Sequence, residues 1–283
     1  MKYPSIPKGK LFNYYFYTSN RSRDFFFYCL LNLKKCNINK IFVPSYIGET
    51  SFEGSGIMDV IIDSKVDYII YPINENLRVN KNTLVSMMKE MASGSIALLF
   101  IHYFGFIDPS YFEITNLAKE KKFFVVDDCA HSYYTYYKYK DLFKGDAAYF
   151  SLHKLIKNIY PKSISLIKEN NNKLFHPKIR KLLNDSDKNK NYNAISRISN
   201  DKRFDFFPAI IDINENIKKR ISQANLYKDI LSKSKLPFKM LIADKNQKLP
   251  LQSFPISFSN KVNRDEIFHE MRELNIQVVS LYY

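Results

Sequence analysis

Glycine, cysteine and tryptophan are scarce in this sequence of 283 residues, which has seven glycines, three cysteines and no tryptophan. Seven glycines are far fewer than the ~7% of ordinary usage. Such scarcity fits either relaxed requirements on tight ligand-binding loops or simple compositional drift. The three cysteines are an odd number without metal-like spacing. They predict reduced thiols in a cytoplasmic protein and exclude a disulfide framework.

Long apolar runs are also missing. A membrane span needs ~18 apolar residues, and the longest run here, Ile96 to Phe106, is interrupted by His102. The start MKYPSIPKGK is basic but has no apolar segment, so no signal peptide is expected. With 46% hydrophobic and 25% charged residues, the composition is that of a globular protein and excludes a disordered or fibrous one.

Positive charge is in excess, with a net charge of +15. Such an excess raises the question of nucleic-acid or membrane-surface binding. However, the stretch from Ser151 to Arg203 has 13 basic and 4 acidic residues and is rich in asparagine and lysine. This concentration favours a solvated lysine-rich surface or, alternatively, a contribution to binding an anionic substrate or a phosphate. Nucleic-acid binding is not predicted.

Short apolar strands alternate with helical patterns along the chain, which predicts an α/β fold with a mostly parallel central sheet and helices on both faces. A helix is expected over Ser22 to Leu33, with Ser22 as its N-cap. A second helix is expected near Lys81 to Met91, and Ile114 to Lys121 is expected to be the end of a third. The predicted strands are Lys40 to Val43, Val66 to Tyr71, Ile96 to Ile101, Phe123 to Asp127, Ala147 to Ser151 and Ser163 to Ile167. Ligands of such a sheet bind beyond the carboxyl ends of its strands.

The chain becomes markedly more polar after about residue 170. We therefore expect a large α/β domain over residues 1–170, a polar, mobile connection over 171–209, and a small α+β domain over 210–283. The small domain is predicted to contain helices at Ile210 to Leu231 and Arg264 to Leu274, and strands at Phe238 to Ile242, Phe254 to Phe258 and Gln277 to Leu281.

The segment from Phe123 to Lys157 carries the residues suited to chemistry. It reads FFVVDDCAHS, then a tyrosine-rich loop, then GDAAYFSLHKLIK. An acid (Asp128), an imidazole (His131) and a lysine (Lys154) near strand ends could bind a pyridinium cofactor and perform amine chemistry. The same residues also fit a solvated Asp-Asp turn, a structural histidine and a surface His-Lys pair. The residues alone therefore indicate an α/β protein that could be a cofactor enzyme.

The order of VPSYIGET, LLFIHYFGF, VVDDCAHS and GDAAYFSLHK resembles the DegT/StrS group of sugar aminotransferases. These are pyridoxal-phosphate enzymes of the aspartate-aminotransferase fold, fold type I. The likeness extends from Tyr17 to Lys168 and, more weakly, to the last predicted strand. The resemblance implies this fold and pyridoxal 5'-phosphate as the cofactor.

The resemblance also implies roles for individual residues. Asp128 matches the aspartate that pairs with the pyridinium nitrogen, His131 the residue that reaches the ring hydroxyl, and Ser151 a serine near the phosphate. TSNRS, from Thr18 to Ser22, is similar to the phosphate-binding turn before a helix. That turn adds three cofactor-binding candidates, Ser19, Asn20 and Arg21.

The catalytic lysine follows from a variant of the family motif. Most members have the Schiff-base lysine five residues after the serine, where this chain has Ile156. A divergent branch has a shorter motif resembling SLRK, in which the lysine follows by three residues. SLHK fits that branch, so Lys154 is the predicted catalytic lysine and Lys157 the reserve. No metal site is predicted.

The sequence departs from the family at several positions. Pro161 and Lys162 replace a usual pair of glycines, and proline fixes φ and removes an N–H donor. Gly48 stands where many members have an aromatic residue stacked on the ring, and neighbouring Tyr46 is the candidate substitute. The motif that reaches the partner subunit's phosphate is not recognisable after Asn170. The small domain ends at Tyr283, earlier than the family's final helix.

The resemblance implies an aminotransferase that passes an amino group, with glutamate as the expected donor, to a nucleotide-linked keto-sugar for surface polysaccharide or lipopolysaccharide biosynthesis. The departures leave open a catalytically silent member that acts as a scaffold or binding protein without the cofactor. A third alternative is sugar dehydration, in which a histidine such as His153 replaces the lysine. A homodimer is expected. The tyrosines from Tyr133 to Tyr139 either line an entrance or form a partly covered loop.

Overall fold

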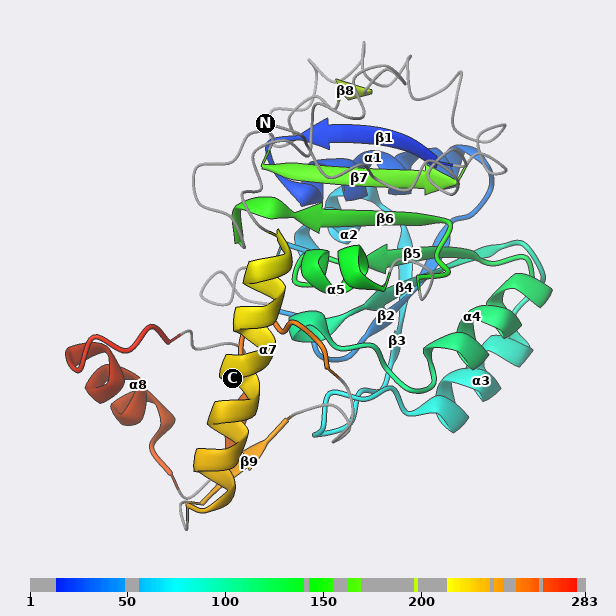
Figure 1. Ribbon diagram of the computed structural model, residues 1–283. Coiled ribbons are helices and arrows are strands. Elements are labelled where there is room, and N and C mark those ends of the chain that lie inside the picture. The colour runs from blue at the N-terminus through cyan, green and yellow to red at the C-terminus, as the bar shows by residue number, and fades with distance from the viewer. Residues whose placement is uncertain are drawn as a thin grey trace.

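The computed structural model describes residues 14–48, 56–139, 143–154, 162–168, 196–197, 213–234, 237–241, 248–259 and 262–278. Its centre is an eight-stranded sheet in the order β3-β2-β4-β5-β6-β7-β1-β8 (Figure 1). The strands of this sheet are β1 (Tyr14–Ser19), β2 (Lys40–Pro44), β3 (Asp67–Tyr71), β4 (Ile96–Ile101), β5 (Phe124–Asp128), β6 (Ala147–Ser151), β7 (Ser163–Lys168) and β8 (Ser196–Arg197). The helices that pack on it are α1 (Ser22–Lys35), α2 (Met58–Ser64), α3 (Lys81–Glu90), α4 (Tyr111–Glu120), α5 (Tyr133–Lys138) and α7 (Ile213–Ser232).

The strand directions bring the candidate residues to one edge. Strands β2 to β6 pair in parallel, whereas β7 is antiparallel to both β6 and β1. Strand β1 therefore runs in the same direction as the parallel set. The predicted α/β fold with a mostly parallel sheet is confirmed, and the ends of β1, β4, β5 and β6 meet at the same edge.

Apolar layers cover both faces of the sheet. Helices α1 and α2 pack on one face through residues such as Phe26, Leu30 and Val60. Helices α3, α4, α5 and α7 cover the other face through residues such as Leu84 and Ile217. Every residue of α1 from Asp24 to Leu30 is buried, as expected of a helix that is apolar nearly all round.

The C-terminal elements comprise α7, a two-stranded sheet of β9 (Phe238–Met240) and β10 (Ile256–Phe258), and α8 (Arg264–Glu273) (Figure 1). Of this region, α7 and residues 249–252 contact the loop that follows β4. Arg220 of α7 donates hydrogen bonds to the carbonyl oxygens of Leu251 and Gln252, at 3.0 and 2.8 Å. The N–H of Gln252 in turn donates to the carbonyl oxygen of Phe104 at 2.9 Å.

Two local predictions are wrong. The N-cap of α1 is Arg21 and not Ser22, because the buried Asp24 carboxylate accepts the Arg21 backbone N–H and also bonds its guanidinium. The tyrosine-rich segment is helix α5 and not a loop. Its first two rings, Tyr133 and Tyr134, are buried against the sheet, so packing outweighs the modest helix propensity of tyrosine.

Other features of the chain were not anticipated or cannot be compared. The sequence patterns did not predict β1, α2 or β8. Residues 277–278 of the predicted last strand are not in a strand, and residues 279–281 lie outside the described part of the chain, as does most of 171–209. In the described ranges, no helix is both long enough and apolar enough to cross a membrane.

Candidate active site

The predicted lysine and histidine lie in direct contact beyond the ends of β5 and β6. Lys154 Nζ is 3.0 Å from His131 Nε2, although 23 positions separate the two residues in the sequence. Lys154 closes a 3-10 turn, Leu152–Lys154, that directly follows β6, and His131 follows β5 by three residues. The neighbouring His153 is directed elsewhere, since its Nδ1 is 3.4 Å from the carbonyl oxygen of Lys162.

The electrostatics of this pair favour a neutral imidazole beside an amine. Burial, together with the positive charge of Lys154, lowers the pKa of His131 to about 3. A neutral imidazole can accept a hydrogen bond from an ammonium group through its unprotonated nitrogen. Burial also lowers the pKa of Lys154, against the opposing attraction of Asp128. Much of the Lys154 side chain is solvent-accessible, but its charged end lies against His131, and desolvation acts there.

Asp128 completes the group at the end of β5. It is 5% exposed, and its Oδ1 accepts the backbone N–H of Ala130 at 2.8 Å. Burial raises the pKa of Asp128, while the Ala130 hydrogen bond and the charge of Lys154 act in the opposite direction. Tyr149, its register neighbour on β6, is buried, and a hydrogen bond with its hydroxyl also acts to lower the pKa of Asp128.

Asp127 lies in a buried hydrogen-bond network that the sequence pattern did not predict. Its Oδ1 is 3.2 Å from His102 Nε2, and its Oδ2 accepts the Tyr111 hydroxyl at 2.8 Å and the Gly145 N–H at 2.9 Å. The carboxyl group is almost fully buried. The Asp-Asp pair is therefore not a solvated turn. Asp127 ties β5 to the loop after β4, to the first turn of α4 and to the segment before β6, next to the backbone that carries Asp128.

The expected phosphate turn lies beside Ser151. Ser22 Oγ and Ser151 Oγ are 2.7 Å apart, which joins the first turn of α1 to the end of β6. Ser19 donates its hydroxyl to the carbonyl oxygen of Arg21 at 2.8 Å, and Asn20 is exposed. The Arg21 guanidinium forms an ion pair with Asp24 at 2.8 Å. The turn thus combines hydroxyl groups, a helix N-terminus and a cation whose charge is shared with a carboxylate.

Tyr46 and Lys157 complete the set of predicted site residues. The Tyr46 ring packs edge-on against Tyr103, with 5.4 Å between ring centroids, and its carbonyl oxygen accepts the Tyr103 hydroxyl. Tyr46 thus joins the apolar cluster around Leu251. Gly48 is buried. Lys157 and Pro161 lie outside the described residues.

Phe104 contacts the site but was not predicted. Its ring lies roughly parallel to that of His131, with 5.8 Å between centroids and an interplanar angle of 19°. Phe104 is buried and has φ 54°, a left-handed conformation that is unusual for a bulky residue. Backbone outliers of this kind cluster at functional sites. The aromatic-glycine pair that begins three residues after the buried strand β4 was the available signal in the sequence.

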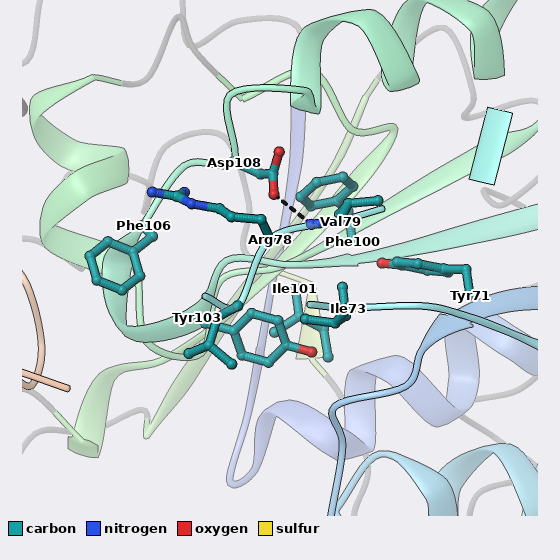
Figure 2. Close-up of a pocket in the computed structure, with 10 residues that line it drawn as sticks. Tyr71, Ile73, Arg78, Val79, Phe100, Ile101, Tyr103, Phe106 and Asp108 are labelled. Carbon is teal, nitrogen blue, oxygen red and sulfur yellow. Dashed lines mark hydrogen bonds between the residues drawn. The ribbon is translucent and has the colours of Figure 1, made fainter. Parts of the chain in front are cut away.

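A small cavity lies near this loop but is not the site. Figure 2 shows its lining at the ends of β3 and β4, where Asp108 accepts the backbone N–H of Val79 at 2.8 Å. The cavity has a volume of about 10 Å³. This volume suits about one water molecule and excludes a pyridine ring. None of the predicted site residues lines it.

The residues present fit pyridoxal phosphate, the cofactor expected from the sequence motifs. An amine, a neutral imidazole and a buried carboxyl group lie together at one edge of the sheet. The buried Ser163 hydroxyl has no hydrogen-bond partner in the part of the chain that the structure describes, and it lies beside Ser151 in the register of β7 with β6. Among the described residues, no group of three or more His, Cys, Asp or Glu side chains is arranged to hold a metal ion.

Solved structures share this fold at low sequence identity. A DegT/DnrJ/EryC1/StrS aminotransferase from Brucella abortus has a TM-score of 0.65 and 14% identity, covering 95% of this chain and 71% of that chain. Helicobacter pylori PseC, an aminotransferase involved in pseudoaminic acid biosynthesis, has a TM-score of 0.65 and 16% identity, with coverage of 94% and 72%. The sugar aminotransferase CalS13 from Micromonospora echinospora has a TM-score of 0.64 and 11% identity, with coverage of 94% and 73%.

Family membership rests on the sequence comparison. The sequence matches no curated protein. The model of the DegT/DnrJ/EryC1/StrS aminotransferase family, however, matches residues 79–283, which include Asp128, His131 and Lys154. The chain therefore belongs to the DegT/DnrJ/EryC1/StrS aminotransferase family, whose cofactor is pyridoxal phosphate.

Proposed function

We propose that this protein is an aminotransferase that uses Lys154 as its catalytic lysine and passes an amino group from an amino acid to a keto-sugar. The contact of 3.0 Å between Lys154 Nζ and His131 Nε2, next to Asp128, is the observation that carries the proposal. Bound pyridoxal phosphate supplies an aldehyde that reacts with amines and a ring that accepts electrons when a proton leaves the neighbouring carbon.

Each of the proposed site residues has a role that its environment supports. Lys154 has a lowered pKa, so a larger fraction of its amine is unprotonated and able to act as a nucleophile and as a proton acceptor. Asp128 would accept a hydrogen bond from the protonated ring nitrogen and hold it in place. His131 would orient the lysine and the ring hydroxyl. Ser151, Ser22 and the first turn of α1 would hold the phosphate.

The finer details of the function are also proposals. The sugar would be linked to a nucleotide, the donor would be glutamate, and the product would enter surface polysaccharide or lipopolysaccharide synthesis. PseC, which shares the fold, acts in the biosynthesis of pseudoaminic acid, and this supports a sugar substrate. We further propose a homodimer in the cytoplasm, with a large domain over residues 1–170 and a small one over 210–283.

An absorption spectrum with peptide mapping tests the proposal. Purified protein mixed with pyridoxal phosphate should develop a band at about 420 nm that borohydride abolishes, and the reduced adduct should map to Lys154. Lys154→Ala should lose the band. Lys162→Ala is the control, because the Lys162 side chain is exposed and its backbone oxygen, which alanine retains, accepts the N–H groups of Leu152 and His153. An adduct on Lys157 would refute the assignment of Lys154.

One observation favours the alternative of a silent family member. The Asp24 carboxylate is buried in the first turn of α1, where the cofactor phosphate is expected to bind. It already accepts the Arg21 N–H and forms an ion pair with the Arg21 guanidinium, which a phosphate would also need. If the folded parent protein shows no band at saturating cofactor, the aminotransferase proposal is wrong. The protein would then be a scaffold or binding protein without the cofactor.

A further inference from the structure

A row of three serine side chains crosses the sheet at the edge where the site lies. Ser163, the first residue of β7, pairs in register with Ser19 of β1 on one side and with Ser151 of β6 on the other. Residues directly opposite each other in antiparallel strands have side chains on the same face, with Cβ atoms about 4.5–5.5 Å apart. The three hydroxyl groups therefore lie side by side on the face that α1 covers.

The hydroxyl of the middle serine differs from those of its two neighbours in its hydrogen bonding. Ser19 donates to the carbonyl oxygen of Arg21, and Ser151 bonds with Ser22. Ser163 is 0% exposed, and its hydroxyl has no hydrogen-bond partner within the described residues. Buried polar groups are nearly always paired, so an unpaired hydroxyl in the middle of such a row calls for an explanation.

The surroundings of the row favour an anion as the missing partner. The bond between Ser22 and Ser151 shows that this face of the row meets the first turn of α1. The N–H groups of a first helical turn have no acceptors within the helix, and the helix dipole favours negative charge there. The only carboxylate at this turn in the described part of the chain is that of Asp24, which Arg21 neutralises in an ion pair.

We propose that Ser163 donates a hydrogen bond to the cofactor phosphate and so completes a row of hydroxyls formed by Ser19, Ser163 and Ser151. This inference rests on the proposed function, because it requires that the protein binds pyridoxal phosphate. It also bears on the loss of the usual glycine pair. Proline at 161 has no backbone N–H to offer, and the Ser163 hydroxyl provides a donor two residues later.

The test compares two serines on the same strand. Ser165 lies two residues further along β7, on the same face, and it too is buried with an unpaired hydroxyl. However, Ser165 pairs in register with Tyr17 and Tyr149 instead of with serines, away from the edge of the sheet. Ser165→Ala is therefore a control that removes the same atom from the same kind of environment without reaching the phosphate.

Binding of pyridoxal phosphate and of pyridoxal, which lacks the phosphate, should be titrated for the parent protein and both variants. Ser163→Ala should weaken pyridoxal phosphate binding by about tenfold or more, the effect of losing one hydrogen bond to a charged group. Its affinity for pyridoxal should stay within about twofold of the parent. Ser165→Ala should leave both affinities unchanged. Without cofactor, Ser163→Ala should melt at or above the temperature of the parent, because it removes an unpaired polar group.

Three results would overturn the inference. Unchanged pyridoxal phosphate affinity in Ser163→Ala would show that this hydroxyl does not contact the phosphate. Equal losses for pyridoxal, or for Ser165→Ala, would show a general loosening of the sheet. If the parent does not bind pyridoxal phosphate at all, the proposed function fails first and this inference with it.

Discussion

Replacing Gly145 with alanine should destabilise the protein strongly, because the new methyl group would displace the Asp127 carboxylate. A Cβ atom on Gly145 would lie 2.4 Å from Asp127 Oδ2 and 3.0 Å from the carbonyl oxygen of Ala147. Ordinary van der Waals contact begins at 3.4 Å, so the carboxylate would have to move by about 1 Å. The Ala147 oxygen belongs to the backbone of β6 and cannot easily make room.

The size of the effect follows from the hydrogen bonds that such a movement breaks. Asp127 Oδ2 accepts the Tyr111 hydroxyl at 2.8 Å and the Gly145 N–H at 2.9 Å. A shift of about 1 Å takes both beyond hydrogen-bonding distance. Hydrogen bonds to charged groups contribute about 1.5–3 kcal/mol each. We therefore expect the free energy of unfolding to fall by at least about 3 kcal/mol, a large part of the roughly 5–15 kcal/mol typical of proteins.

Urea unfolding followed by circular dichroism provides the measurement. Gly94→Ala is the matched control, because Gly94 has φ 74° but its Cβ would meet nothing closer than Lys122 at 4.0 Å. That variant should lose about 1 kcal/mol from backbone strain alone. The double variant Gly145→Ala, Tyr111→Phe should lose less free energy of unfolding than the sum of the losses in the two single variants, because both substitutions remove the same hydrogen bond. The reasoning is refuted if Gly145→Ala costs no more than Gly94→Ala.

Two further predictions concern titration and thiol reactivity. The pKa of His131 is about 3 in the folded protein against an ordinary value of 6.5, so between these values the unfolded chain binds a proton that the folded one does not. This group alone lowers the free energy of unfolding as the pH falls below 6.5, by up to about 1.4 kcal/mol per pH unit. The loss of stability between about pH 7 and about pH 4.5, measured by urea unfolding, should therefore be smaller in His131→Gln than in the parent protein. An equal loss in the two proteins would contradict this prediction. Cys29 and Cys129 are buried, with pKa values raised by burial, whereas Cys36 is partly exposed. A maleimide should modify one thiol quickly in the native protein and none in Cys36→Ser, and a second fast thiol would show that the core is open.

The sequence predicted those parts of the fold that depend on local pattern. Apolar runs such as IALLFI marked the buried strands, and Asp128, His131 and Lys154 were expected near strand ends. The structure adds that β5 and β6 are parallel neighbours, which brings the residues after them together. The contact between Lys154 and His131 is the result. Helix α5 could not be predicted in this way, because its tyrosines favour strands locally and become helical only against Phe150 and its neighbours.

The roles of Asp127 and Ser163 could not be predicted either, for a different reason. Asp127 depends on Tyr111, 16 positions earlier, and on Gly145, 18 positions later, neither of which stands out in the sequence. The position of Ser163 between Ser19 and Ser151 follows from the strand order, which places β7 between β1 and β6. Pairing between strands that are distant in sequence decides which small polar residues share a face, and no local pattern records it.

The electrostatic surroundings of Lys154 depend on parts of the chain that contribute no predicted site residue. A protonated His131 would place two cations 3.0 Å apart, which would cost about 5 kcal/mol at an effective dielectric constant of about 20. Burial keeps the imidazole neutral, and the Phe104 ring forms part of that burial. The carbonyl oxygen of Phe104 accepts the N–H of Gln252, and the Gln252 carbonyl oxygen in turn accepts a hydrogen bond from Arg220 of α7. Helix α7 and the segment around Gln252 therefore support the Phe104 ring that covers His131, and this burial favours the neutral imidazole beside the amine.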